Sequence, residues 1–109
     1  RQIDAFYTAA RQKFTDFLAG DFKVKRAGGR EISEFPGIPD DWVGQQVSAI
    51  IAKLNTGRAL TLDDVYNAVD KVFEHKGSPG QDPGPIFKAI FESAFDAVTT
   101  SSRSLAVNA

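Results

Sequence analysis

The sequence predicts a small, mainly α-helical domain in which four helices form an irregular bundle and one β-hairpin lies between the first and second helices. Four segments carry apolar residues at helical spacing, a glycine pair separates two short arms containing Val and Ile, and Gly- or Pro-rich stretches separate the remaining segments. The 109 residues, 42% of them hydrophobic, suffice for one core without disulfides or metals. We therefore expect a single domain. Its predicted core contains Phe14, Phe17, Val47, Ile50, Ile51, Val69, Phe73, Phe91 and Phe95.

The first helix is predicted from Ile3 to about Leu18, with Gly20 as the residue that ends it. Polar side chains fall largely on the opposite face from the apolar ones, as in a helix that packs on a core. The apolar positions that define its buried face are Ile3, Phe6, Tyr7, Ala10, Phe14, Phe17 and Leu18.

Residues 21–35, DFKVKRAGGREISEF, are predicted to form the β-hairpin. A two-residue turn at 28–29 fixes which residues face each other. This register pairs Phe22 with Phe35, Lys23 with Glu34, and Arg26 with Glu31. A shift by one residue, with the turn at 27–29, would instead place Arg26 against Arg30, and like charges directly opposite are unfavourable. We therefore expect the first register.

The second helix is predicted to follow the prolines of FPGIPDD, with Asp40 or Asp41 as its N-terminal cap. Its apolar face consists of Val43, Val47, Ile50, Ile51 and Leu54. The third helix is predicted from about Leu62 to Lys76, because Thr61 and Asp64 resemble a capping box in which Asp replaces Glu. Its buried residues are predicted to be Leu62, Val65, Tyr66, Val69, Val72 and Phe73.

Residues 77–85 are rich in Gly and Pro and are predicted to link the third helix to a fourth, C-terminal helix. Pro85 suits the first turn of that helix. Phe87, Phe91 and Phe95 then recur every four residues and form a Phe ladder. From about residue 100 we expect a frayed tail, in which residues 105–107 could still dock locally.

The composition narrows the classes of function. A net charge of −1 gives no overall attraction to nucleic acid or anionic membranes, and the absence of Cys excludes a disulfide scaffold, a thiol nucleophile and Cys-bound zinc. No apolar run approaches the length of a membrane span. We expect a soluble protein, with the cytoplasm slightly favoured. Because the chain begins at Arg1 and contains no Met, we also expect a domain or processed piece of a larger protein.

The residues capable of catalysis have simpler structural interpretations. His75 is the only histidine and is predicted near the C-terminal end of the third helix, where the helix dipole favours a cation. The acidic pairs at 40–41 and 63–64 stand where helices begin, and no serine lies in a known nucleophile motif. We therefore predict a protein that is not an enzyme and has no cofactor or metal site.

The preferred functional hypothesis is a non-catalytic protein–protein interaction or assembly module. Its binding residues would be the Phe ladder, with Trp42 and Phe35 as a second patch. The partner would be another protein or a second copy, with possible exchange of the C-terminal helix between copies. The competing interpretation, which the helical spacing favours, places the ladder in the core of the domain. Phe91→Asp separates the two, because it leaves a folded monomer only if Phe91 lies in an interface.

The alternative hypothesis is a nucleic-acid-binding module that uses the basic hairpin at 23–30. Its candidate residues are Lys23, Lys25, Arg26 and Arg30. The glycines do not have the spacing of a phosphate-binding loop, and in the preferred register only Lys25 and Arg30 lack an acidic residue opposite. Two such cations predict only weak, salt-sensitive binding.

Overall fold

The computed structural model describes residues 2–25, 31–32, 39–54, 59–73, 83–99 and 104–105. Its helices are α1 (Gln2–Ala19), α2 (Asp40–Ala52), α3 (Leu62–Phe73) and α4 (Gly84–Val98). Strands β1 (Val24–Lys25) and β2 (Glu31–Ile32) form one antiparallel pair, and β3 (Leu60–Thr61) and β4 (Ser104–Leu105) form another. The predicted fold class, four helices with a hairpin between the first and second, is confirmed.

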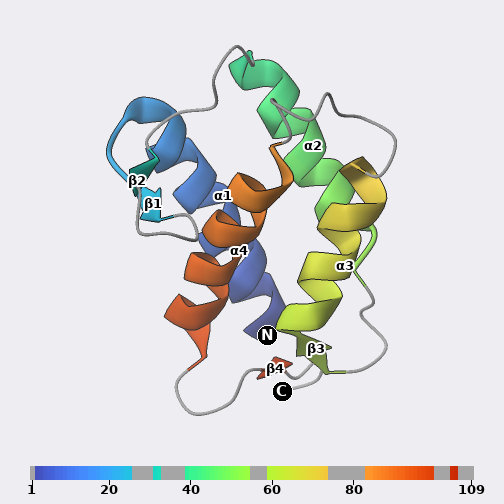
Figure 1. The fold of residues 1–109 in the computed structure, drawn as a ribbon. Helices are drawn as coiled ribbons and strands as arrows, with labels where there is room; N and C mark the ends of the chain where they lie inside the picture. The colour runs from blue at the N-terminus through green and yellow to red at the C-terminus, as the bar shows by residue number, and fades with distance from the viewer. Residues whose placement is uncertain are drawn as a thin grey trace.

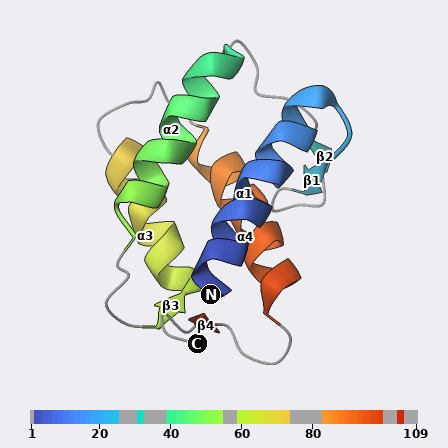
Figure 2. The same ribbon diagram turned by 180° about the vertical axis from the view of Figure 1, so that it is seen from behind.

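Consecutive helices run in opposite directions and form a ring in which each helix contacts its two neighbours (Figures 1 and 2). The contact between α1 and α4 is the most extensive, and the contact between α1 and α2 is the smallest of the four. The hairpin strand β1 packs against α4. Strands β3 and β4 lie at the end of the bundle where α1 begins. The bundle is therefore tightly closed on one side of α1 and less so on the other.

Aromatic side chains fill the centre of the bundle. Phe6 and Phe17 of α1 and Phe87, Phe91 and Phe95 of α4 are all fully buried. Every residue of the predicted core is buried except Ile51, which is partly buried and packs against the others. The helical spacing of apolar residues thus identified the buried faces, since residues three and four apart share a helix face.

The end of α1 shows why the sequence has glycine at this point. Gly20 has a φ of 85°, a conformation that side chains with a Cβ disfavour. Its N–H donates to the Phe17 carbonyl at 3.1 Å, and the Asp21 N–H donates to the Asp16 carbonyl at 2.8 Å. These two hydrogen bonds make a Schellman motif, which satisfies carbonyls at the end of the helix.

The predicted capping box at the start of α3 is present. The Thr61 N–H donates to Oδ2 of Asp64 at 2.9 Å, and the Asp64 N–H donates to Oγ1 of Thr61 at 3.2 Å. The described part of α3 ends at Phe73, and residues 74–76 lie outside the described part of the chain.

The predicted cap of α2 is wrong. Pro39 occupies the cap position in an extended conformation, with its carbonyl accepting from the Val43 N–H at 3.2 Å. The helix therefore begins at Asp40, and both aspartates lie in its first turn. Oδ1 of Asp41 accepts a hydrogen bond from the N–H of the next residue, Trp42, at 2.9 Å. The carboxylates still lie where the helix dipole favours negative charge.

The predicted hairpin register is also wrong by one residue. Val24 pairs with Ile32 and Lys25 pairs with Glu31, which is the register rejected on charge grounds. Buried Val24 now faces partly buried Ile32, and both pack with the core. The predicted register would have placed Ile32 opposite Lys25. Apolar burial decided the register here, because a slip by one residue moves every side chain to the other face.

The pairing of β3 with β4 was not predicted. Leu60 faces Leu105, and Thr61 faces Ser104. Leu60 is fully buried, so β3 belongs to the core. Residues 100–103 and 106–109 of the predicted tail lie outside the described residues, as do residues 77–82 of the predicted linker. Helix α4 begins at Gly84 with Pro85 in its first turn, as expected.

Candidate functional site

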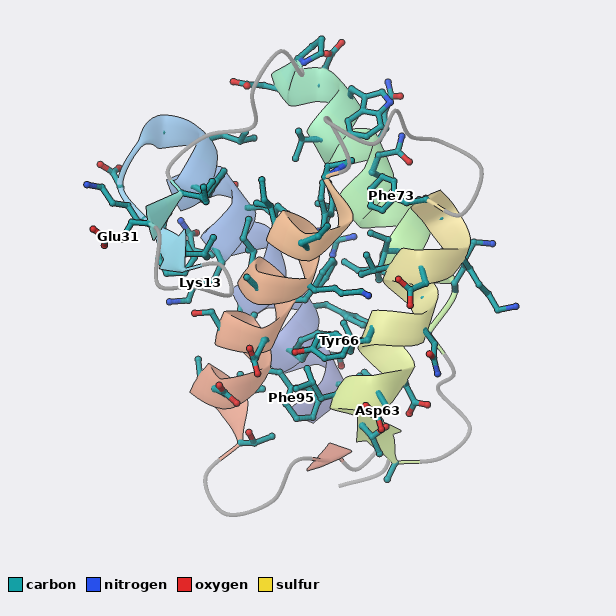
Figure 3. The ribbon with its side chains drawn as sticks, in the orientation of Figure 1. Lys13, Glu31, Asp63, Tyr66, Phe73 and Phe95 are labelled. Atoms are coloured by element: carbon teal, nitrogen blue, oxygen red, sulfur yellow. The ribbon has the colours of Figure 1, made fainter. Side chains whose placement is uncertain are left out.

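The Phe ladder lies in the core of the bundle. Phe87, Phe91 and Phe95 are each 0% exposed. Phe14 of α1 contacts two of them, with ring centroids 5.0 Å from those of Phe87 and of Phe91. Phe95 meets Phe6 edge-on at 5.8 Å, and Figure 3 shows it on the inner side of α4. In this conformation the ladder offers no surface to a partner.

Trp42 closes the end of this aromatic core. Its side chain is partly buried, and its ring lies 5.9 Å from that of Phe73 and 6.4 Å from that of Phe87. In Figure 3, Phe73 points from α3 towards α2, the helix that carries Trp42. The second residue of the predicted patch, Phe35, lies outside the described residues. The contacts of Trp42 place its ring at the edge of the core.

The basic hairpin is only partly described. Lys23 is exposed, and Lys25 stands opposite Glu31 in the observed register. Arg26 and Arg30 lie outside the described residues. Lys13 of α1 approaches this side of the bundle, with its Nζ 4.7 Å from the ring centroid of Phe22 (Figure 3). Compared with the predicted register, Lys25 thus gains an acidic residue opposite it.

The candidate catalytic residues do not meet in the part of the chain that the structure describes. His75 lies outside it. The acidic pairs stand in the first turns of α2 and α3, at opposite ends of the bundle (Figure 1). Among the described residues, no three His, Asp or Glu side chains form a group that could hold a metal ion.

A groove between α1 and α2 is the feature of the described surface that the sequence analysis missed. It has a volume of about 210 Å³ and lies between the C-terminal half of α1 and the N-terminal half of α2. Figure 2 shows these two helices in front of the bundle. Its lining residues are Arg11, Phe14, Thr15 and Leu18 of α1 and Val43, Gly44, Val47 and Ser48 of α2.

The groove has an apolar floor and a polar rim. The floor consists of Phe14 and Val47, which are almost wholly buried, and Val43, which is fully buried. Thr15 and Ser48 are exposed on opposite helices. The Thr15 hydroxyl donates to the Arg11 carbonyl at 2.9 Å. Thr15 and Ser48 thus give the rim short polar side chains.

Gly44 contributes open space to this groove. A Cβ placed on Gly44 would meet nothing within 4 Å, and its φ is not positive. Neither a close contact nor an unusual backbone conformation therefore requires glycine here. Glycine inside a helix costs about 0.5–1 kcal/mol relative to alanine. Glycine at position 44 therefore lowers the stability of α2 slightly and leaves space open at the groove.

Within the described residues the guanidinium of Arg11 has no hydrogen-bond or ion-pair partner, although its backbone carbonyl accepts the hydrogen bond from the Thr15 hydroxyl. The other helix positions that lie beside it on α1 are Tyr7, Thr8, Phe14 and Thr15, none of them acidic. Ser48, across the groove, is neutral. Arg11 therefore brings a cation without a carboxylate to one end of an apolar groove.

One signal in the sequence could have pointed to this groove. Gly44 stands between two members of the apolar face, Val43 and Val47, in the interior of a predicted helix. A helical glycine that is not at a helix end suggests either a close approach or a position kept open. Which of the two applies becomes clear only from the placement of α1 beside α2.

Within the described residues no large hydrophobic side chain is exposed, and no helix is both long enough and apolar enough to cross a membrane. Comparison of the chain with protein-family models, curated proteins and solved structures finds no significant match.

Proposed function

We propose that this chain is a non-catalytic protein-interaction module that receives a short segment of a partner protein in the groove between α1 and α2. The observation that carries the proposal is the open position at Gly44, in a groove with an apolar floor that is also lined by Arg11, whose guanidinium has no partner among the described residues. An apolar pocket with a few polar groups around it is the usual form of a binding site.

The size of the groove favours an anchor side chain over a whole small molecule. Its volume of about 210 Å³ is below the roughly 300–1,000 Å³ of sites that enclose a drug-sized ligand. A single Leu or Phe side chain fits such a volume. Protein interfaces commonly concentrate their binding energy in one or a few such anchors.

Selection from a phage-displayed library of random peptides tests this function. We expect selected peptides to bind the wild-type protein and to lose binding to Gly44→Leu, which fills the groove. Gln45→Leu is the matched control, because it adds the same side chain at the next residue, which is exposed and outside the groove. Peptides that bind all three proteins equally, or repeated selections that yield none, would contradict the proposal.

Assembly through exchange of α4 is a second candidate. The buried ladder of α4 supports it, because the same contacts with Phe6, Phe14 and Phe73 can form between copies. The Gly- and Pro-rich sequence between α3 and α4 is the kind of connection that permits exchange. Sedimentation equilibrium over a wide concentration range, at low and high salt, is expected to show a dimer that persists in salt. A monomer at every concentration would rule this candidate out.

A further inference from the structure

The chemistry of the groove also specifies the segment that binds there; this inference rests on the proposed function. The floor is apolar and small, which suits one bulky aliphatic or aromatic side chain. The rim is polar and contains one charge, that of Arg11. The two parts of the groove therefore recognise two different groups.

Among the described residues, the guanidinium of Arg11 is free to bind a carboxylate, whereas the two partly buried lysines of the helices already contact other side chains. The Nζ of Lys88 lies 2.7 Å from Oδ1 of Asp70, and the Nζ of Lys13 lies over the ring of Phe22. The guanidinium of Arg11 has no such partner within the described residues. Its planar donors match a carboxylate in two parallel hydrogen bonds.

The spacing along α1 sets the distance between the two recognised groups. Arg11 precedes Thr15 by one helical turn, which is about 6 Å along the helix. An extended peptide advances about 3.3 Å per residue. A carboxylate one or two residues from the anchor can therefore reach Arg11 while the anchor lies over Gly44 and Val47.

We infer that the groove binds an acidic peptide segment in which one Leu or Phe anchor is followed or preceded, within two residues, by a carboxylate that pairs with Arg11. The anchor rests on Phe14 and Val47 in the space left open by Gly44. The carboxylate supplies selectivity among apolar segments, because a basic residue at the same place would face a like charge.

Titration of the isotope-labelled protein with blocked tripeptides, followed by amide chemical shifts, tests this inference. The probes are N-acetyl-Phe-Ala-Glu-amide, its Gln and Lys analogues, and N-acetyl-Ala-Ala-Glu-amide. We expect the Glu peptide to shift groove residues and to bind about two- to fivefold more tightly than the Gln peptide, the range measured for exposed ion pairs. The Lys peptide and the peptide without an anchor should bind more weakly still.

Three variants test which residues produce the preference for the Glu peptide and the binding of the anchor. Arg11→Ala should abolish the difference between the Glu and Gln peptides, whereas Lys71→Ala, which removes an exposed cation of α3, should leave it unchanged. Gly44→Ala should weaken binding of every anchored peptide while the protein stays folded, because the added methyl has free space.

The outcomes separate this inference from the function on which it rests. Equal affinity for the Glu, Gln and Lys peptides, or a Glu preference that survives Arg11→Ala, overturns the assignment of an acidic partner and leaves a purely apolar groove. No shift of groove amides with any anchored peptide overturns the proposed function as well. If Arg11→Ala loses both peptide binding and the amide spectrum of a folded protein, this variant cannot test the inference. The inference is then tested by Gly44→Ala and by the peptide series with the wild-type protein.

Discussion

The two sides of α1 are built differently. Towards α4, α1 presents Phe6 and Phe14, and their rings pack against those of α4 at centroid distances as short as 5.0 Å. Towards α2, α1 presents Arg11, Thr15 and Leu18 and leaves a groove. The same helix therefore packs densely against α4 on one side and borders a groove on the other.

This difference follows from where the bulky residues lie around the helix. An interface filled by aromatic rings excludes water and packs densely, since each ring buries a large apolar area. The α1–α2 interface combines smaller side chains with a glycine, so it has too few atoms to fill the same space. The two faces share Phe14, whose ring packs on those of Phe87 and Phe91 and also lies in the groove floor.

The largest expected change in the free energy of unfolding comes from removing an aromatic ring at the α1–α4 interface. Phe91→Ala should lower the free energy of unfolding by about 3–5 kcal/mol, because Phe91 is fully buried among aromatic rings. Val47→Ala, in the groove floor, should cost about 1–2 kcal/mol for the two methyl groups removed. Chemical denaturation measures both. Equal losses of stability would mean that the α1–α4 and α1–α2 interfaces contribute equally to folding, which would contradict the difference described above. Phe91→Asp should unfold the domain.

The buried residues at the α1–α4 interface were largely predictable from the sequence, whereas the groove between α1 and α2 was not. Helical spacing identifies which residues share a buried face, so the Phe ladder and the α1 face could be placed before α1 and α4 were paired. A groove depends on the gap between two helices, and no local pattern sets that gap. Gly44 marks the place but does not reveal what lies across from it.

The errors at the hairpin and at α2 have local causes. The register was predicted from the charges of Arg26, Arg30 and Glu31, whereas the structure pairs Val24 with Ile32. Cross-strand charge pairs contribute only about 0.2–1 kcal/mol, which is less than the burial of an aliphatic side chain. At α2, the carbonyl of Pro39 accepts the first helical hydrogen bond, so Pro39 is the cap residue and both aspartates lie inside the first turn. At the hairpin, the weaker charge term gave way to apolar burial.

Two glycines, one directly after α1 and one within α2, offer a test in which the expected change in stability is of intermediate size. Gly20→Ala should destabilise the protein by about 1–2 kcal/mol, because alanine disfavours the φ of 85° at the end of α1. Gly44→Ala should stabilise it by about 0.5–1 kcal/mol through better helix propensity. Added Cβ atoms have open space at both positions, so the comparison isolates the backbone. Thermal unfolding of the two variants provides the measurement. A loss of stability in Gly44→Ala would show that the groove is not open at this residue.

The smallest expected change in stability concerns the ion pair between α3 and α4. Asp70 of α3 and Lys88 of α4 lie 2.7 Å apart, but their side chains are 62% and 32% exposed, so solvent screens the attraction. Asp70→Ala should therefore cost less than about 1 kcal/mol, and high salt should shrink the difference from wild type. Lys88 also approaches the ring of Tyr66, which points from α3 towards α4 in Figure 3. Lys88→Met, which removes the charge but keeps the length, should thus cost slightly more than Asp70→Ala. Urea denaturation at two salt concentrations distinguishes these cases. A loss above about 2 kcal/mol for Asp70→Ala exceeds the range for exposed pairs and would mean that charge, as well as apolar packing, holds α3 against α4.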